Sequence, residues 1–435
     1  MTFISSPPER LPRILMEVHE GRIVSLFLEN GFLERCVDKG AEVKVICPAA
    51  TVPGFVDKYG TKGVSWAALP AHRDLTRFEV LVMKIGRRLS TTGMVGLRRL
   101  LWDAVERPLV ARKADAELRL IREFKPDVVF SPHIAEGFGR RLVAAAGAQG
   151  VPSVGNLASW DNTYRPLRAR PGSVTCWSER SKRELAAFCA YRENQVEVTG
   201  APAFDPYFQD GATWSREKLC GEMGLDAACP IILYASLGQF RPFMDETGTF
   251  AALVEALDRG LVPGDPQIVL RLHPLSRLVY FEPFLERSDV IVSRFKGYTP
   301  GMMWTPSRDE VIAAGNLMRH ADVCISPGST MTIEPAIFET PTLLPVVNLY
   351  TQEAYTDFFR RIWLEGHFKE IVDKDWVPVV RTVEELGTAI AKALDDPSWY
   401  REGRAAIRET ILGPLDGRAT ERIADFVLRS GKERA

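Results

Sequence analysis

The sequence ADVCISPGSTMTIEPAIFETP, residues 321–341, decides the expected fold of the chain. Asp322 to Ser326 form a short apolar run with β-branched residues, which predicts a buried strand of a parallel sheet. Pro327 and Gly328 end this strand, and an apolar helical pattern then runs to Thr340-Pro341. A strand, a turn of small residues and a helix aim unpaired backbone N–H groups at an anion. The stretch therefore predicts a phosphate site, with a crossover helix and its polar cap as the alternative.

Side chains around the turn fit a phosphate ligand. Ser329 and Thr330 offer hydroxyl donors where the phosphate would lie, and Glu334, about one turn into the helix, could accept both hydroxyls of a ribose. Pro335 removes a helical hydrogen bond and clashes with the preceding turn, so the helix is expected to be short or bent at its start.

Length and composition limit the class of protein. A chain of 435 residues is too long for one ordinary core and suggests two domains. A net charge of −1 gives no case for nucleic acid binding. The seven scattered cysteines form no CxxC pair, which fits a reducing compartment and no zinc site. The start of the chain carries no signal-peptide pattern, and no 18-residue apolar run occurs, so we expect a cytoplasmic protein.

The α/β pattern occurs twice. Strand, helix and strand are expected at 14–18, 23–32 and 42–47, and the pattern restarts with an apolar strand at 231–235. No glycine fingerprint follows the first strand, which argues against a classical NAD site. We predict two Rossmann-like domains facing each other across a cleft. The acceptor domain is expected at 1–205 and the nucleotide-donor domain at 206–400, with helices at 401–435 that could cross back to the first domain.

Ligands of open parallel sheets bind at the carboxyl ends of strands. The predicted strand ends of the second half carry Gly238, Gln239, Arg271, His273, Ser326, Gly328, Ser329 and Thr330. Pro274 holds the backbone of His273 extended, and an imidazole and a guanidinium beside a helix N-terminus suit a phosphate. Each residue alone could be structural, but together they favour a nucleotide phosphate site.

Candidate proton acceptors follow the strands of the first half. They are His19, Glu20, His133, Glu136, Asp161 and Asn162. Each could instead cap a helix or shape a turn. As catalytic base we rank Glu20 first, then Asp161 and His19, because the loop after the first strand lies near the switch point of the sheet. Burial in a closed cleft would raise the pKa of Glu20 toward the working range.

Residues 73–113 form a basic and apolar stretch. It holds ten Lys and Arg against four acids, interleaved with large apolar residues. Such a stretch can lie in a membrane interface beside anionic lipid, at the inner face of the plasma membrane. The alternative is a pair of surface helices whose apolar stripes face the core.

Two motifs resemble a known group of enzymes. RLHP at 271–274 and SPGSTMTIEPAIFETP at 326–341 resemble the His-Pro and Ser-Ser/Thr motifs of bacterial sialyltransferases, Kdo transferases and CDP-glycerol glycerophosphotransferases, and SWDN at 159–162 is similar to a segment of the last. The resemblance implies a GT-B glycosyltransferase whose His273, Ser329 and Thr330 hold the donor phosphate. It also implies that no metal or other cofactor is needed. The D-x-D at 373–375 lies too far down the chain for a metal-dependent GT-A enzyme.

The expected function is transfer of a sugar, or a sugar-like group, from a pyrimidine-nucleotide donor. The acceptor would be a hydroxyl of a cell-surface glycan or glycolipid precursor, attacked by direct displacement with inversion. The alternatives are a non-hydrolysing nucleotide-sugar 2-epimerase, which needs no acceptor, and a catalytically silent partner that only binds nucleotide or glycan.

Overall fold

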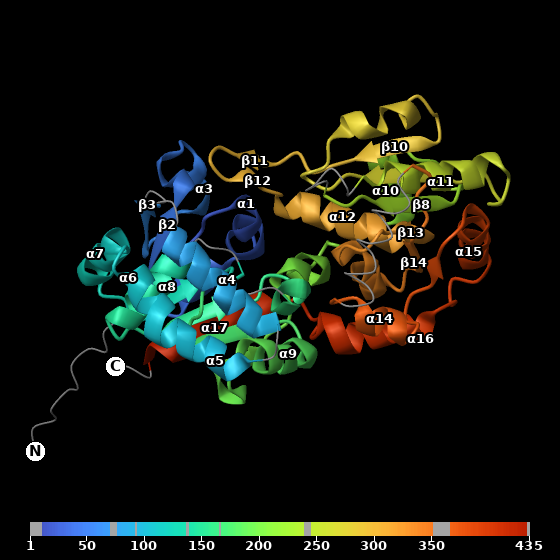
Figure 1. Cartoon of the computed structure of the whole chain (residues 1–435). Coiled ribbons are helices and arrows are strands. Elements are labelled where there is room, and N and C mark those ends of the chain that lie inside the picture. The colour runs from blue at the N-terminus through green and yellow to red at the C-terminus, as the bar shows by residue number, and fades with distance from the viewer. Residues whose placement is uncertain are drawn as a thin grey trace, which may run out of the picture. The chain divides into compact units, whose positions relative to one another are not determined.

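The computed structural model describes residues 11–69, 76–91, 94–135, 139–164, 167–238, 245–350 and 366–432. The chain divides into two compact units (Figure 1). Unit 1 comprises Met1–Asp205, Tyr298–Thr305 and Asp416–Ala435, and unit 2 comprises Pro206–Gly297 and Pro306–Leu415. Two later segments thus belong to unit 1: Asp416–Ala435, which lies within the 401–435 range whose helices could cross back, and Tyr298–Thr305, for which no return was expected.

Unit 1 is built on a seven-stranded parallel sheet with the order β3-β2-β1-β4-β5-β6-β7. Its strands are β1 (Arg13–Glu17), β2 (Glu42–Cys47), β3 (Val64–Ala68), β4 (Val128–Ser131), β5 (Ser153–Asn156), β6 (Ser173–Cys176) and β7 (Val196–Val198). The strand order reverses between β1 and β4, which makes the carboxyl ends of these two strands the switch point of the sheet.

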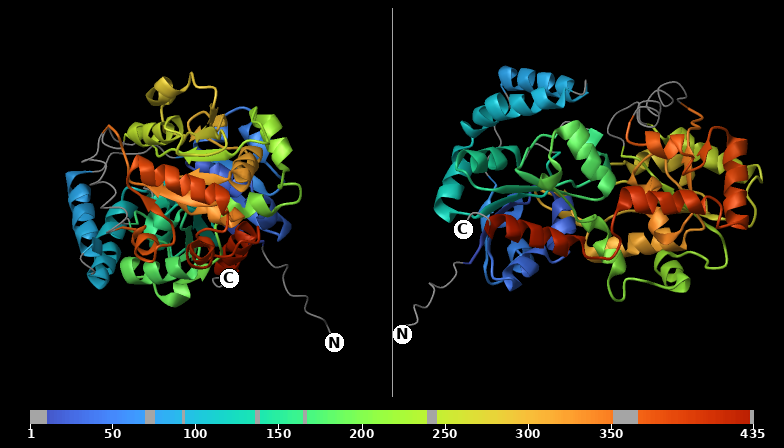
Figure 2. Two further views of the ribbon diagram at one scale, coloured as in Figure 1. Left: turned by 90° about the vertical axis from the view of Figure 1, so that its right-hand side faces the viewer. Right: turned by 90° about the horizontal axis from the view of Figure 1, so that it is seen from below.

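Helices cover both faces of this sheet. The helical segments are α1 (Gly21–Ile23), the π-helical turn η1 (Val24–Leu28), α2 (Phe32–Asp38), η2 (Pro48–Thr51), α3 (Phe55–Tyr59), α4 (Arg77–Thr91), α5 (Val95–Leu101), η3 (Trp102–Glu106), α6 (Arg107–Ala111), α7 (Asp115–Phe124), α8 (Gly139–Ala148), η4 (Trp160–Tyr164), α9 (Glu179–Cys189), η5 (Glu193–Gln195) and α17 (Ala419–Lys432). Figure 2 shows α17, in red, beside the blue first elements of the chain. Its Ile423 and Val427 are fully buried in the same core as Phe27, Phe32 and Phe130.

A hairpin from the second half of the sequence also belongs to unit 1. Its strands are β11 (Tyr298–Thr299) and β12 (Met303–Trp304). The N–H of Gly21 donates to the carbonyl of Met302 at 2.9 Å, and Met302 is buried with a 1% exposed fraction. A Cβ on Gly21 would lie 2.1 Å from the carbonyl oxygen of Trp304. The turn after Glu20 therefore requires glycine because the hairpin backbone lies against it.

Unit 2 contains a six-stranded parallel sheet with the order β10-β9-β8-β13-β14-β15. Its strands are β8 (Ile231–Ala235), β9 (Gln267–Arg271), β10 (Val290–Ser293), β13 (Val323–Ile325), β14 (Thr342–Pro345) and β15 (Val379–Val380). The order reverses between β8 and β13, so the strand of the 321–341 stretch lies at the switch point of this sheet.

The helical segments of unit 2 include several short turns. They are η6 (Pro202–Phe208, which begins in unit 1), α10 (Arg216–Met223), α11 (Thr247–Asp258), η8 (Leu278–Phe284), α12 (Arg308–His320), η9 (Thr330–Thr332), η10 (Glu334–Phe338), α14 (Lys369–Asp373), α15 (Val383–Asp395), α16 (Arg401–Ile407) and η12 (Arg408–Leu412). The expected helix after β13 is two 3-10 turns, η9 and η10. Pro335 lies in the first turn of η10, and Glu339 ends it in the left-handed region at φ 63°.

These two sheets confirm the predicted fold class, an α/β protein with two Rossmann-like domains. Within the part of the chain that the structure describes, none of the helices combines the length and apolar character needed to cross a bilayer.

Candidate active site

His19, Glu20 and His133 form a cluster at the switch point of unit 1. The β1–β4 register pairs Met16 with Phe130, and the same offset brings His19 level with His133 beyond the strand ends. The two imidazole rings stack with centroids 6.2 Å apart and an interplanar angle of 16°. Glu20 Oε1 lies 3.0 Å from Nδ1 of His133. Glu20 and His19, which were ranked as possible bases, thus lie beside His133, which was named as a further proton acceptor.

The protonation states of this cluster differ from the sequence-based expectation. Burial tends to raise the pKa of Glu20, but the hydrogen bond with His133 and neighbouring positive charge outweigh it and lower that pKa below its ordinary value. The prediction that burial would raise the pKa of Glu20 is therefore wrong. Burial is also the main cause that lowers the pKa of His19 to about 4. At neutral pH Glu20 is a carboxylate and His19 a neutral imidazole.

The hydrogen bond to Glu20 defines a tautomer for His133. An ionised carboxylate only accepts hydrogen bonds, so Nδ1 of His133 must donate. In the neutral ring Nε2 then has a lone pair and can accept a proton. This carboxylate–imidazole pair has the arrangement of a general base with its orienting group. Sequence ranking placed the carboxylate in the basic role, and this geometry makes His133 a second candidate for it.

Glu17, at the end of β1, lies beneath the cluster. Ser131 Oγ donates to Glu17 Oε1 at 3.0 Å, and this oxygen lies 3.8 Å from Nδ1 of His19. Burial is the main cause that raises the pKa of Glu17 to about 8. A Cβ on Gly139, the first residue of α8, would come within 2.2 Å of Glu17 Oε1, so glycine is needed there. Sequence reasoning missed Glu17, although an acid that ends an otherwise apolar strand was a detectable signal.

Asp161 lies outside this cluster. Asp161 is half-buried in η4. The ligand atoms of His19, Glu20 and His133, in contrast, all lie within 4.8 Å of one another. The neighbouring Asn162 accepts the N–H of Ser159 at 3.1 Å, which is the turn-shaping alternative. Glu136 lies outside the described residues.

The three clustered residues could also bind a divalent cation. Two imidazoles and a carboxylate suit Zn²⁺ or another transition metal, and His19 is neutral at pH 7, as a metal ligand must be. The donor set therefore fits a metal as well as a proton acceptor, and only chelation distinguishes the two uses.

In unit 2, hydroxyl groups gather after β13. Ser326 Oγ lies 3.0 Å from Ser329 Oγ, and Thr332 Oγ1 donates to Ser326 Oγ at 3.0 Å. The hydroxyl of Ser329 also accepts the N–H of Met331 and so caps η9. Gly328 has φ 101°, which a side chain would strain, and Thr330 is half-buried beside it. The predicted Ser/Thr turn thus exists. Ser329 caps the helical turn that follows it, as expected from the alternative of a crossover helix with a polar cap.

His273 follows the neighbouring strand β9. Its N–H donates to Ser236 Oγ at 2.8 Å, which ties the ends of β8 and β9 together. The N–H of Leu275 donates to Nδ1 of His273 at 3.1 Å. Nδ1 is therefore an acceptor, so Nε2 carries the proton and has the character of a phosphate donor. Gly238 follows β8 near this point, while Gln239 lies outside the described residues.

Arg271 is a half-buried cation at the end of β9. Its guanidinium stacks 3.9 Å from the centre of the Phe295 ring, and Nη1 donates to Ser293 Oγ at 2.8 Å. Burial lowers its pKa to about 10, so it remains charged at neutral pH. The buried Nη2 has no hydrogen-bond partner among the described residues. An anion would satisfy this donor.

Glu334 is engaged within unit 2. Its Oε1 accepts the hydroxyl of Tyr207, whose pKa is raised well above its ordinary value, mainly by burial. The predicted ribose contact would therefore depend on Oε2, the other carboxylate oxygen.

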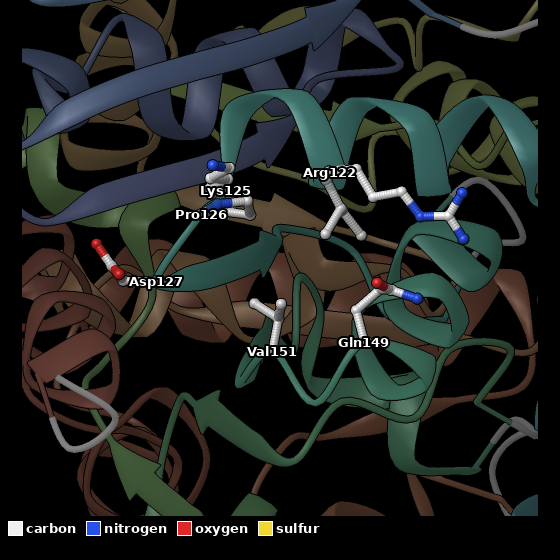
Figure 3. Close-up of a pocket in the computed structure, with 7 residues that line it drawn as sticks. Arg122, Lys125, Pro126, Asp127, Gln149 and Val151 are labelled. Carbon is white, nitrogen blue, oxygen red and sulfur yellow. The ribbon is translucent and has the colours of Figure 1, made fainter.

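A surface hollow of about 400 Å³ lies elsewhere in unit 1 (Figure 3). It is lined by Ile121, Arg122, Lys125, Pro126, Asp127, Gln149 and Val151. Asp127 immediately precedes β4 and Val151 lies two residues before β5, so the hollow lies at the amino ends of the strands. Ligands of such sheets bind at the opposite edge, and this hollow is not the candidate site.

Comparison with known proteins found no matching family model and no matching curated sequence. Solved structures do match over nearly the whole chain. UDP-GlcNAc 2-epimerase from Neisseria meningitidis bound to UDP-GlcNAc has a TM-score of 0.57 at 13% identity, with 97% of this chain and 100% of that chain covered. UDP-GlcNAc 2-epimerase from Methanocaldococcus jannaschii, in complex with UDP-GlcNAc and UDP, has a TM-score of 0.54 at 12% identity, with 97% and 100% covered. The glycosyltransferase from Rickettsia africae ESF-5 has a TM-score of 0.53 at 14% identity, with 96% and 99% covered.

The chain has a GT-B-like fold. The similar structures include both epimerases and a glycosyltransferase, so the fold is common to the two reactions. The choice between them depends on the residues of the two switch points.

Proposed function

We propose that the protein is a glycosyltransferase that moves a sugar from a pyrimidine-nucleotide donor to a hydroxyl of a glycan or glycolipid precursor. The observation that carries the proposal is the 3.0 Å pair of Glu20 and His133. A hydroxyl is a poor nucleophile, and a neutral imidazole oriented by a carboxylate removes its proton as it attacks. The carboxylate also stabilises the imidazolium that forms.

In the proposed reaction, the acceptor oxygen attacks the anomeric carbon directly. Its proton passes to Nε2 of His133, the new glycosidic bond forms, and the bond from the anomeric carbon to the phosphate oxygen breaks. A single displacement inverts the configuration at that carbon. The nucleotide leaves with its bonding electron pair on the phosphate.

The switch point of unit 2 would bind the leaving phosphate. Arg271 supplies a permanent positive charge with an unsatisfied buried N–H donor, and Nε2–H of His273 supplies a second donor. The turn at Ser329 and Thr330 adds hydroxyl groups. Such preorganised donors can stabilise the developing charge without a metal ion.

A non-hydrolysing 2-epimerase is the second candidate, because most of the similar solved structures are UDP-GlcNAc 2-epimerases of this fold. The same base would then remove a proton from a sugar carbon, and no acceptor would be consumed. A protein that only binds nucleotide or glycan is the third, and it would release no nucleotide.

One experiment separates the three. The purified protein is incubated with UDP-, CDP-, CMP- and GDP-sugars, with and without a panel of glycan and glycolipid acceptors, and free nucleotide and sugar products are measured. Nucleotide release that requires an acceptor supports the transferase. Acceptor-independent conversion of the sugar to its 2-epimer supports the epimerase and refutes the proposal. His133→Gln is the matched inactive control for either activity.

A further inference from the structure

The helices α4 and α5 of unit 1 turn apolar side chains outward. Phe78, Leu81 and Ile85 of α4 have exposed fractions of 56%, 52% and 45%. Their spacing of three and four residues puts them on one stripe of the helix. Leu97 and Leu100 continue the exposed apolar surface on α5, which packs beside α4. In Figure 2 the pair lies at the periphery of unit 1.

Two acidic groups of this region, Glu79 and Glu106, are buried, whereas the side chain of Asp103 is 45% exposed and pairs with Arg99. Glu79 has an exposed fraction of 4% and accepts from Lys113 Nζ at 2.6 Å. Glu106 has an exposed fraction of 2% and binds Arg98 at 2.8 Å and Arg140 at 3.1 Å. Ion pairs therefore lie on the inner side together with the buried Val82, and Phe78, Leu81 and Ile85 lie on the outer side. The alternative that the apolar stripes face the core holds for Val82 but not for these three residues.

The outward charge of this surface is positive. Residues 76–101 contain six Lys and Arg against a single acid, the buried Glu79. Arg77, Lys84 and Arg88 are exposed, and their spacing of seven and four residues places them on a stripe next to Phe78, Leu81 and Ile85. An apolar stripe bordered by cations matches the boundary between acyl chains and anionic headgroups.

We propose that the outer surface of α4 and α5 binds the headgroup region of an anionic lipid bilayer. The apolar stripe would enter the acyl boundary, while Arg77, Lys84 and Arg88 contact the headgroups. This surface goes beyond the sugar-transfer chemistry, since none of its residues belongs to either switch point. Arg73 and residues 92–93, within the range predicted from sequence, lie outside the described residues.

The test is co-sedimentation of the full chain with vesicles of phosphatidylcholine alone or with 30% phosphatidylglycerol. We expect at least tenfold stronger partitioning to the anionic vesicles at low salt, and its loss at about 0.5 M NaCl, where surface charges are screened. The triple variant Arg77→Gln/Lys84→Gln/Arg88→Gln should lose roughly fivefold in partitioning per removed charge. Phe78→Gln/Leu81→Gln/Ile85→Gln should lose at least tenfold.

The matched control removes three exposed charges elsewhere in unit 1, as Arg119→Gln/Arg122→Gln/Arg192→Gln, and should keep more than half of the wild-type partitioning. Circular dichroism melts verify that all variants are folded. Equal binding to neutral and anionic vesicles, or α4 variants that bind like wild type, would overturn the proposal. The proposal would also be overturned if light scattering finds that wild type is a dimer and the apolar variant a monomer, since the surface would then pair two copies of the chain.

Discussion

The sharpest test of the proposed base is Glu20→Gln. The amide keeps the shape of the side chain, and its Oε1 can still accept from Nδ1 of His133, so the imidazole keeps its orientation. Only the negative charge is lost. The variant therefore separates the electrostatic contribution of Glu20 from its positioning role.

The expected magnitude follows from the change in charge during the reaction. When His133 takes the proton of the acceptor, the ring that donates a hydrogen bond to Glu20 changes from a neutral imidazole to a charged imidazolium. A hydrogen bond to a charged group contributes about 1.5–3 kcal/mol. The Glu20 side chain is 34% exposed, and solvent screening keeps the value within that range. At about 1.4 kcal/mol per factor of ten, turnover should fall by about 10- to 100-fold.

The assay compares kcat and KM of wild type and variant with the donor found in the nucleotide-sugar screen, together with nucleotide affinity by calorimetry. We expect the loss in kcat, with nucleotide affinity within about twofold, because the phosphate donors lie in unit 2. Asp161→Asn serves as the matched control and should remain active. Near-normal turnover of Glu20→Gln, together with a large loss for Asp161→Asn, would refute the assignment and make Asp161 the base.

Three further predictions follow from the same geometry. His273→Ala and Ser329→Ala should each weaken nucleotide binding by about 1–3 kcal/mol in calorimetry, and unchanged affinity in both would remove the phosphate assignment. Activity should persist in excess EDTA, whereas complete loss that a divalent cation restores would show that His19, Glu20 and His133 bind a metal. Relative to Glu17→Gln, the free energy of unfolding of wild type should fall as pH rises from about 4.5 to about 8, because the unfolded Glu17 ionises in this range while the folded, buried carboxyl keeps its proton. Denaturant titrations of both proteins at pH 5 and 8 measure this difference, and the same pH dependence in both would show that Glu17 does not contribute.

Local pattern was sufficient to predict the strands that carry the candidate site. The apolar runs at 14–18, 42–47 and 231–235 predict β1, β2 and β8 within a residue or two, since buried parallel strands read as continuous apolar segments. Candidate residues at strand ends could then be chosen without any coordinates. The hairpin 298–305 could not be placed, because two-residue strands have almost no pattern and their contacts are with Gly21, far away in sequence.

The contacts within the candidate site could not be predicted because they depend on strand order. Glu20 and His133 are 113 residues apart, and they meet only because β4 is the direct neighbour of β1. The expected shift in the pKa of Glu20 is also reversed, since the hydrogen bond with His133 and the nearby His19 and Arg22 together outweigh the effect of burial. Once the β1–β4 register is known, one offset pairs Ser131 with Glu17 and His133 with His19. The sequence thus supplies the chemical groups of the candidate site, and the sheet topology determines which of them lie together.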